Sequence, residues 1–228
     1  MRDSFVTIIH GAQAVRLYGD GSALVERNRV LVAADLHLGR SETLQDGGVP
    51  VPGVGKEDLA RLEYRAQKVG ADSVVILGDL LHGPASLTAG VESMLKRWVR
   101  AVDRPVHLVR GNHDRVSAAR IESLGIEVAA GTLSVGSLAL VHDAAEAPDC
   151  GPVIAGHTHP CVRLSDRGDR LRLPVFVQTQ FALTLPAYGT FTGCSVVPRE
   201  RSTRLYVLVD GDVIPLPGGT QINGSKIG

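Results

Sequence analysis

The chain has 228 residues, enough for one α/β domain that buries roughly 70% of its unfolded surface. It carries 24 Lys and Arg against 24 Asp and Glu, so no net field attracts nucleic acid or an anionic membrane. No stretch approaches the ~18 apolar residues of a membrane span, and the N-terminus lacks the apolar core of a signal peptide. We therefore expect a cytoplasmic protein without membrane contacts.

The first half of the chain alternates predicted strands and helices. Apolar runs typical of strands cover residues 4–9, 14–18, 23–25, 30–34, 74–77 and 105–110. The run 30–34 is apolar throughout, as in a central strand covered on both faces. Apolar residues at helical spacing predict helices over 56–69 and 91–102, and Ser117 is a candidate N-cap for a short third helix. This alternation is typical of a parallel sheet with helical crossovers.

From residue 133 onwards the helix signals almost vanish. Short strands are expected at 133–135, 138–141, 153–155, 162–164, 171–177, 194–197 and 205–209. We expect one domain over residues 1–214, in which two mixed sheets pack face to face with helices on the outside. Residues 215–228 are expected to form a loose C-terminal tail.

The three cysteines are Cys150, Cys161 and Cys194. Their odd number and the lack of C-x-x-C spacing indicate neither a disulfide framework nor a thiolate zinc site. We expect all three to be small, buried apolar residues.

Five of the predicted strands end in polar residues that can bind a metal ion. These residues are Asp35, His37, Asp79, Asn112, His142, His157 and His159. Packing alone rarely places Asp, Asn and His at five strand ends, so we expect the seven side chains to form one site.

This donor set contains oxygen and imidazole nitrogen but no thiolate, which indicates Mn²⁺, Fe or Zn²⁺ rather than a thiolate zinc site. Seven ligands are too many for one ion with an open position, but they suit two ions ~3.5–4 Å apart that share a carboxylate. Asp79 is the expected bridge because it stands alone after its strand, whereas Asp35 and His37 leave one strand end together. Such an ion pair activates water for in-line attack on phosphorus.

Two histidines near these donors are candidates for roles other than metal binding. His113 follows Asn112 and is the candidate general acid, because a leaving alkoxide needs a proton. Asp114 is expected to orient the His113 ring. His82 lies on the segment that follows Asp79 and is a candidate either for supporting a metal ligand or for contact with the substrate phosphate.

The motifs resemble those of the calcineurin-like metallophosphoesterases. They are Asp35-Leu36-His37, Gly78-Asp79, Gly111-Asn112-His113-Asp114, the lone His142, and Gly156-His157-Thr158-His159. The resemblance implies an α/β (α+β) fold, a four-layer αββα sandwich, with a dinuclear site and the ligand roles given above.

Longer stretches resemble one bacterial branch of this family, the ligase-associated DNA-damage-response endonucleases. They are residues 34–40, 78–82, 155–160 and 185–193. The branch implies a Mn²⁺-dependent phosphodiesterase that cuts single-stranded or unpaired DNA in repair, in functional association with DNA ligase or helicase factors. It also makes Arg40 a candidate contact for the substrate phosphate.

Two other functions remain open. The same metals and His113 would serve a phosphatase or phosphodiesterase for small molecules such as cyclic nucleotides. A non-catalytic interaction scaffold is a third alternative, although every ligand is present. Composition gives DNA little support, because the Arg clusters in 163–172 and 199–204 are typical of a solvated surface. Tyr188 and Phe191 are the candidates for stacking on bases.

Overall fold

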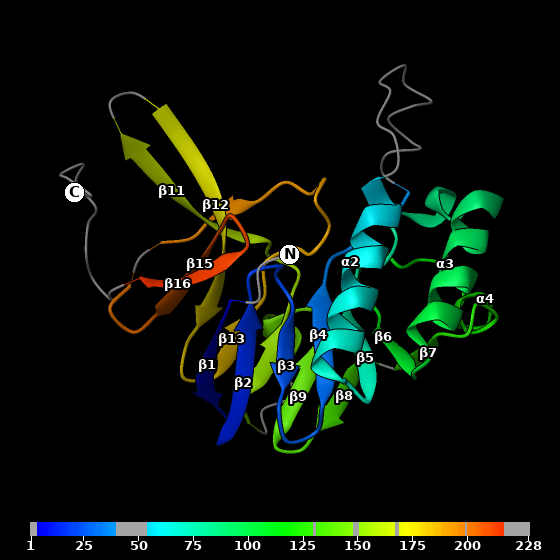
Figure 1. The fold of residues 1–228 in the computed structure, drawn as a ribbon, viewed down its shortest axis with the longest axis horizontal. Helices are drawn as coiled ribbons and strands as arrows, with labels where there is room; N and C mark the ends of the chain where they lie inside the picture. The colour runs from blue at the N-terminus through cyan, green and yellow to red at the C-terminus, as the bar shows by residue number, and fades with distance from the viewer. Residues whose placement is uncertain are drawn as a thin grey trace.

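The computed structural model describes residues 4–39, 54–129, 131–147, 151–166, 169–198 and 200–216. This part of the chain forms two β-sheets, with α-helices against one of them (Figure 1). None of its helices combines the length and apolar character needed to cross a membrane. The cytoplasmic location stays a prediction.

The first sheet contains seven strands of the described chain, in chain order. They are β1 (Phe5–His10), β2 (Gln13–Tyr18), β3 (Ala23–Val25), β4 (Val30–Ala34), β5 (Ser73–Leu77), β6 (Val106–Val109) and β7 (Glu127–Ala129). Strands β1 to β4 pair antiparallel, and β4 to β7 pair parallel. All residues of β4 are buried, as expected from its continuous apolar run.

Helices cover the outer face of this sheet. They are α2 (Val54–Val69), the 3₁₀ helix η1 (Pro84–Ser86), α3 (Ala89–Val102) and the short α4 (Ala118–Glu122). The Thr88 side chain caps α3 by accepting a hydrogen bond from the amide of Val91, 3.3 Å away. Trp98 lies in the buried stripe of α3 and packs in one core with Leu31 and Ile76 of the sheet. Ser117 caps α4, as predicted.

The second sheet follows in the C-terminal part of the chain. It contains β8 (Thr132–Val135), β9 (Leu138–Val141), β10 (Val153–Ala155), β11 (Pro160–Asp166), β12 (Asp169–Gln178), β13 (Ala182–Thr184), β14 (Ser195–Val196), β15 (Arg204–Val209) and β16 (Asp212–Leu216). Strands β9, β10 and β13 run parallel. Over the described residues, the outer face of these strands carries the 3₁₀ helix η2 (Ala144–Glu146), through Ala144.

A second core lies between the two sheets. Val32 and Val75 of the first sheet pack there with Leu140, Ile154 and Phe176 of the second. Leu31 of β4 faces the helices while Val32 faces this inner core, because successive side chains of a strand point to opposite faces. The predicted sandwich of two mixed sheets is confirmed.

The C-terminal boundary differs from the expectation. The sequence places Pro215 and Leu216 in a tail, but in β16 they pair with Tyr206 and Leu205. Proline is tolerated there because β16 has only β15 as a partner in the described chain. Residues 217–228 lie outside the described residues, and the assignment of 1–214 to one domain stays a prediction.

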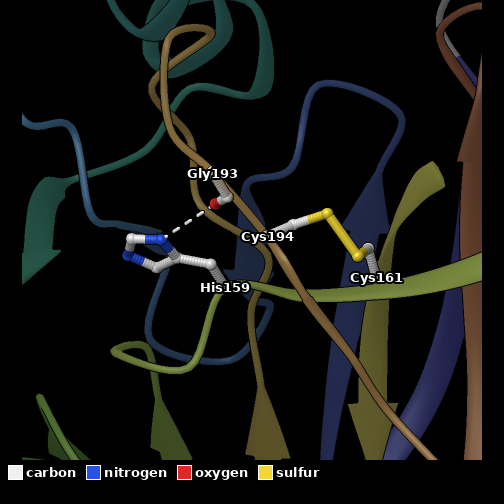
Figure 2. The surroundings of a disulfide bond; sticks show 4 residues. All are labelled: His159, Cys161, Gly193 and Cys194. Carbon is white, nitrogen blue, oxygen red and sulfur yellow. Dashed lines mark hydrogen bonds between the residues drawn. A yellow bond between two sulfur atoms is a disulfide. The ribbon is translucent and has the colours of Figure 1, made fainter.

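The expectation for the cysteines was wrong for one pair. Cys161 and Cys194 form a disulfide, with Cα atoms 5.7 Å apart (Figure 2). The two residues are 33 positions apart, and the parallel pairing of β11 with β14 brings them together, so no spacing rule could detect the bond. Cys161 is fully buried, as expected, and Cys150 lies outside the described residues.

Candidate metal centre

The predicted donors lie at the carboxyl ends of parallel strands. In the first sheet, β4 leads into Asp35 and His37, β5 into Asp79, and β6 into Asn112. In the second sheet, the parallel strands β9 and β10 lead into the remaining three donors, His142, His157 and His159. The carboxyl ends of parallel strands share one edge of a sheet, and the two edges face each other across the sandwich.

Most of these donors have a backbone conformation that L-residues rarely adopt. Residues with positive φ among them are Asp35 (56°), His37 (49°), Asp79 (47°), His157 (70°) and His159 (44°). A left-handed residue directly after a strand turns the chain sharply, so that the side chain projects from the sheet edge. Strained backbone concentrated at one site is typical of functional residues.

Two glycines next to the donors make room for them. A Cβ atom on Gly111 would lie 2.2 Å from Oδ1 of Asp79, and one on Gly78 would lie 2.2 Å from Nδ1 of His142. Neither distance is sterically allowed. A glycine after the apolar run therefore allows a donor from another strand end, in the same sheet for Gly111 and in the other sheet for Gly78, to pack closely against the backbone.

A first group of donors contains Asp35, His37, Asp79 and His159, with one ligand atom of each within 4.8 Å of the others. Oδ2 of Asp35 accepts a hydrogen bond from the amide of His157, at 2.9 Å. Its Oδ1 is buried without a hydrogen-bond partner among the described residues, and it lies 3.6 Å from Nε2 of His159. A buried, unpaired carboxylate oxygen is costly unless a cation binds there.

The tautomer of His159 follows from its second ring nitrogen. Nδ1 lies 3.1 Å from the carbonyl oxygen of Gly193 (Figure 2). A carbonyl can only accept, so Nδ1 carries a proton and Nε2 is the nitrogen that faces the donor group, 3.3 Å from Nε2 of His37. Burial acts to lower the pKa of His159, but the Asp35 carboxylate raises it overall, so a cation bound beside Asp35 would take the place of the proton on Nε2. Burial lowers the pKa of His37 to about 3, which keeps its ring neutral and able to bind a metal ion.

A second group contains Asp79, His142 and His157, and so shares Asp79 with the first. Nδ1 of His142 donates to the carbonyl of Leu77, 3.0 Å away, so its Nε2 is the unprotonated nitrogen. This Nε2 lies 3.0 Å from Oδ1 of Asn112 and 3.0 Å from Nδ1 of His157. The amide oxygen of Asn112 therefore faces a lone pair, which is unfavourable without a cation between them.

The donor chemistry fits divalent metal ions. Acceptor atoms converge in both groups, and backbone carbonyls fix the rings of His142 and His159, the arrangement that orients metal-binding histidines. Nitrogen and oxygen donors suit divalent ions such as Mn²⁺, Fe or Zn²⁺, and Asp79 is the residue that the two groups share. The structure thus brings all seven predicted donors together.

The predicted partner of His113 is different in the structure. The carboxylate of Asp114 was expected to orient the His113 ring, but it accepts hydrogen bonds from the amides of Gly111 (3.0 Å) and Leu81 (3.1 Å). Nδ1 of His113 instead lies 2.8 Å from the carbonyl oxygen of His82. Burial raises the pKa of Asp114, against the effect of these amides. Asp114 thus shapes the turn that carries Asn112 and His113.

The ring of His82 lies beside that of His113. The two rings stack with centroids 5.8 Å apart, and both are near His37. The three imidazoles form a further group whose nitrogens lie within 4.8 Å, without a carboxylate. One face of the first donor group is therefore lined by histidines.

The other candidates for substrate contact have mixed outcomes. Arg40 lies outside the described residues. Tyr188 is only 2% exposed and its ring lies 4.4 Å below the guanidinium of Arg61, so it cannot stack on a base as expected. Phe191 is 47% exposed and keeps that candidacy. Arg172 is exposed at the edge of a hollow near His159.

Asp143 and Arg110 also support the site, although the motifs do not mark them. Oδ2 of Asp143 lies 3.7 Å from Nε2 of His157, whose other nitrogen, Nδ1, faces His142. Its position directly after His142 is the signal that could have found it. Arg110 donates to the carbonyls of Asp114 (2.6 Å) and Val116 (2.9 Å) and so fixes the turn after β6.

Two hollows open beside the donors and meet at His159. One has a volume of about 470 Å³ and is bordered by Arg61, Arg172 and the segment from Ala187 to Cys194. The other has a volume of about 660 Å³ and is lined by His157 and His159, which follow β10, and by Gly193 and Cys194. A substrate can therefore reach the first donor group from the surface.

Comparisons with known proteins agree with this chemistry. The calcineurin-like phosphoesterase family matches residues 28–137. The chain is similar to the crystal structure of Pseudomonas putida nuclease MPE, with 33% sequence identity, a TM-score of 0.81, and coverage of 93% of this chain and 100% of the other. Yfce, a phosphoesterase from E. coli, has 18% identity and a TM-score of 0.46, over 81% of this chain and 96% of its own. A comparison with curated protein sequences gives no match.

Proposed function

This chain belongs to the calcineurin-like phosphoesterases, metal-dependent hydrolases of phosphate esters, and on that premise we propose that it is a Mn²⁺-dependent dinuclear endonuclease acting on single-stranded or unpaired DNA. The observation that carries the metal centre is the sharing of Asp79 by two groups of converging acceptor atoms. The nuclease among the similar structures supports a nucleic-acid substrate.

We assign Asp35, His37, Asp79 and His159 to one ion, and Asp79, Asn112, His142 and His157 to the other. Two bound divalent ions supply a water of lowered pKa and neutralise charge on the phosphate oxygens. The protein fixes the ligand geometry. Its carbonyls at Leu77 and Gly193 hold the protons of His142 and His159 on Nδ1, so that each Nε2 stays free for binding.

His113 is the proposed general acid. The carbonyl of His82 holds the ring through Nδ1, which leaves Nε2 to carry a proton toward the leaving oxygen. Its position beside His37 places it at the edge of the first donor group. We expect His113→Ala to keep both metal ions and to lose about 10²–10⁴-fold in diesterase rate. Loss of metal from this variant would instead make His113 a ligand.

The function can be tested on metal-free protein with and without added Mn²⁺. The substrates are circular single-stranded DNA, bis-p-nitrophenyl phosphate and p-nitrophenyl phosphate. We expect Mn²⁺-dependent opening of the circle, and its loss in Asp79→Asn. His107→Gln is the matched control, because His107 lies in β6 beside Glu127, at 3.2 Å, and belongs to neither donor group.

A phosphodiesterase for small molecules is the second candidate, and the balanced charge of the chain favours it. Hydrolysis of the diester dye without cleavage of the circle would support this candidate against the endonuclease. A role in DNA repair, together with DNA ligase or helicase factors, stays a prediction. It requires that the enzyme first be shown to cut DNA.

A further inference from the structure

The disulfide between Cys161 and Cys194 lies directly beside a proposed metal ligand. Cys161 follows His159 by two residues on β11, and Cys194 directly follows Gly193, whose carbonyl holds the His159 ring (Figure 2). The bond therefore ties the neighbour of Gly193, which orients the ring, to the strand β11, which begins directly after His159.

The other attachments of residues 190–197 are hydrogen bonds, among them one of 2.9 Å from the amide of Val197 to the carbonyl of Cys161 and one of 2.8 Å from the hydroxyl of Thr192 to the carbonyl of Gly189. The amide of Ser195 donates to the carbonyl of His159 at 2.9 Å, and β14 contains only Ser195 and Val196. On the preceding side, the amide of Thr190 donates to Asp58 at 3.1 Å. Gly193 lies between these points and is exposed. The disulfide one residue further on is the covalent link between this part of the chain and β11.

We propose that the Cys161–Cys194 disulfide positions His159 for metal binding and that its reduction weakens the ion held by the first donor group. With the bond intact, the Gly193 carbonyl keeps the proton on Nδ1 and directs Nε2 toward Asp35 and His37. Without it, the carbonyl can move and the ring can rotate or change tautomer. The second donor group does not contain His159 and keeps its affinity.

The geometry leaves the bond open to a dithiol reductant. Cys161 is fully buried, but Cys194 is half-buried and lines both hollows. One reductant thiolate attacks Sγ of Cys194, the bond between the cysteines breaks, and Cys161 leaves as a thiolate. The second reductant thiolate then displaces Cys194 from the mixed disulfide. The reductant becomes a disulfide, and the two cysteines take up its electrons and protons.

The inference rests on the proposed metal centre but not on the substrate. Its test is a calorimetric titration of metal-free protein with Mn²⁺, before reduction, after reduction by a dithiol and desalting, and after reoxidation. Thiol counting must give one thiol before reduction and three after it, since the chain has three cysteines. The double variant Cys161→Ser/Cys194→Ser should behave like reduced protein, and Cys150→Ser is the matched control.

We expect reduction to raise the dissociation constant of one Mn²⁺ by about 10–100-fold, the usual effect of losing a group that orients a metal ligand. Reoxidation should restore the original constant. The constant of the other ion stays unchanged. Unchanged binding of both ions after reduction, equal weakening of both, or three free thiols in the untreated protein would overturn the proposal. Because no phosphate ester takes part in the titration, failure of the endonuclease assay leaves this result intact.

Discussion

One added methyl group beside a donor can prevent the donors from converging, and the glycines next to the donors are where such a group would clash. A methyl group at residue 111 would meet both Oδ1 and the backbone nitrogen of Asp79, at 2.2 and 2.4 Å. Neither atom is the end of a flexible side chain that can move away without cost, because Oδ1 also accepts from the amide of His113. The shared carboxylate must therefore shift if Gly111 is replaced.

We expect Gly111→Ala to lose Mn²⁺ from both groups and to destabilise the protein by about 1–3 kcal/mol, the usual cost of overpacking. Gly83→Ala is the matched control, since its backbone is extended and nothing lies within 4 Å of the added methyl. Metal content by atomic absorption and urea unfolding measure the two effects. Retention of both ions by Gly111→Ala would contradict the assignment of Asp79 as the bridge.

His10 gives a pH prediction outside the metal centre. It is 2% exposed and its Nε2 lies 2.9 Å from the carbonyl of Val153. Burial lowers its pKa below the usual 6.5, although the carbonyl acts in the other direction. A folded-state pKa below the unfolded one gives stability that is present above pH ~6.5 and is lost as the pH falls through the folded value.

We therefore expect the unfolding free energy of metal-free protein to fall between about pH 7.5 and about pH 5.5, and to fall less in His10→Gln. Glutamine can keep a donor for Val153 but does not take up a proton. Urea unfolding at both pH values gives the comparison, with His107→Gln as control because that ring is partly exposed. Equal slopes for wild type and His10→Gln would refute the assignment.

At the scale of the elements, a buried ion pair joins the helix α2 to the first sheet. Arg65 of α2 is 1% exposed, and its Nε lies 2.7 Å from Oδ2 of Asp20, in the turn between β2 and β3. Its guanidinium also lies 4.3 Å from the ring centroid of Tyr18. This contact attaches the helix layer to the antiparallel end of the first sheet.

Removing one charge of that pair should be costly. Asp20→Asn leaves the guanidinium of Arg65 buried beside a neutral group, and we expect a loss of about 3–5 kcal/mol in unfolding free energy. Arg29 and Asp72 form an exposed pair at 3.2 Å, so Asp72→Asn is the control, with a loss of at most ~1 kcal/mol. Similar losses in the two variants would mean that burial does not decide the strength of these pairs.

Features that depend on a local sequence pattern could be predicted, whereas features that depend on contacts between distant residues could not. The run 30–34 and the stripe around Trp98 were predictable because strand and helix periodicity are local. The strands β7 and β13 have only three residues, and they were missed because, unlike β3 and β10, they do not carry a run of Val, Leu or Ile bounded by turn residues. The donors were predictable as residue types after strands.

The groups that orient the site histidines were harder to predict, because they come from distant segments of the chain. The carbonyls of His82 and Gly193 orient His113 and His159, but every residue has a carbonyl and the sequence marks neither. Asp114 follows His113 in the chain, yet its side chain turns to the amide of Leu81. Neighbouring residues in a turn can point in opposite directions, which is why adjacency misled the assignment.

At the scale of the whole molecule, the candidate metal centre brings together donors from the two sheets. Asp35, His37, Asp79 and Asn112 follow strands of the first sheet, and His142, His157 and His159 follow strands of the second. A ligand that binds the folded protein but not the unfolded chain stabilises the fold in proportion to the logarithm of its concentration.

We expect Mn²⁺ at about 100 times its dissociation constant to add about 2.7 kcal/mol per site to the unfolding free energy. The increase should disappear in Asp79→Asn and persist in His107→Gln. Thermal unfolding with and without a chelator measures it. A metal-independent melting temperature in the wild type would contradict the proposed centre.

Each sheet is built from one continuous stretch of the described chain, with the change between Ala129 and Thr132. A protein expressed as two fragments separated there would carry each sheet complete but the donor groups divided. Asp79 would travel with the first fragment and His142 with the second. Reassembly of such fragments should accordingly respond to divalent cations, which would make the hydrolase a split reporter for manganese.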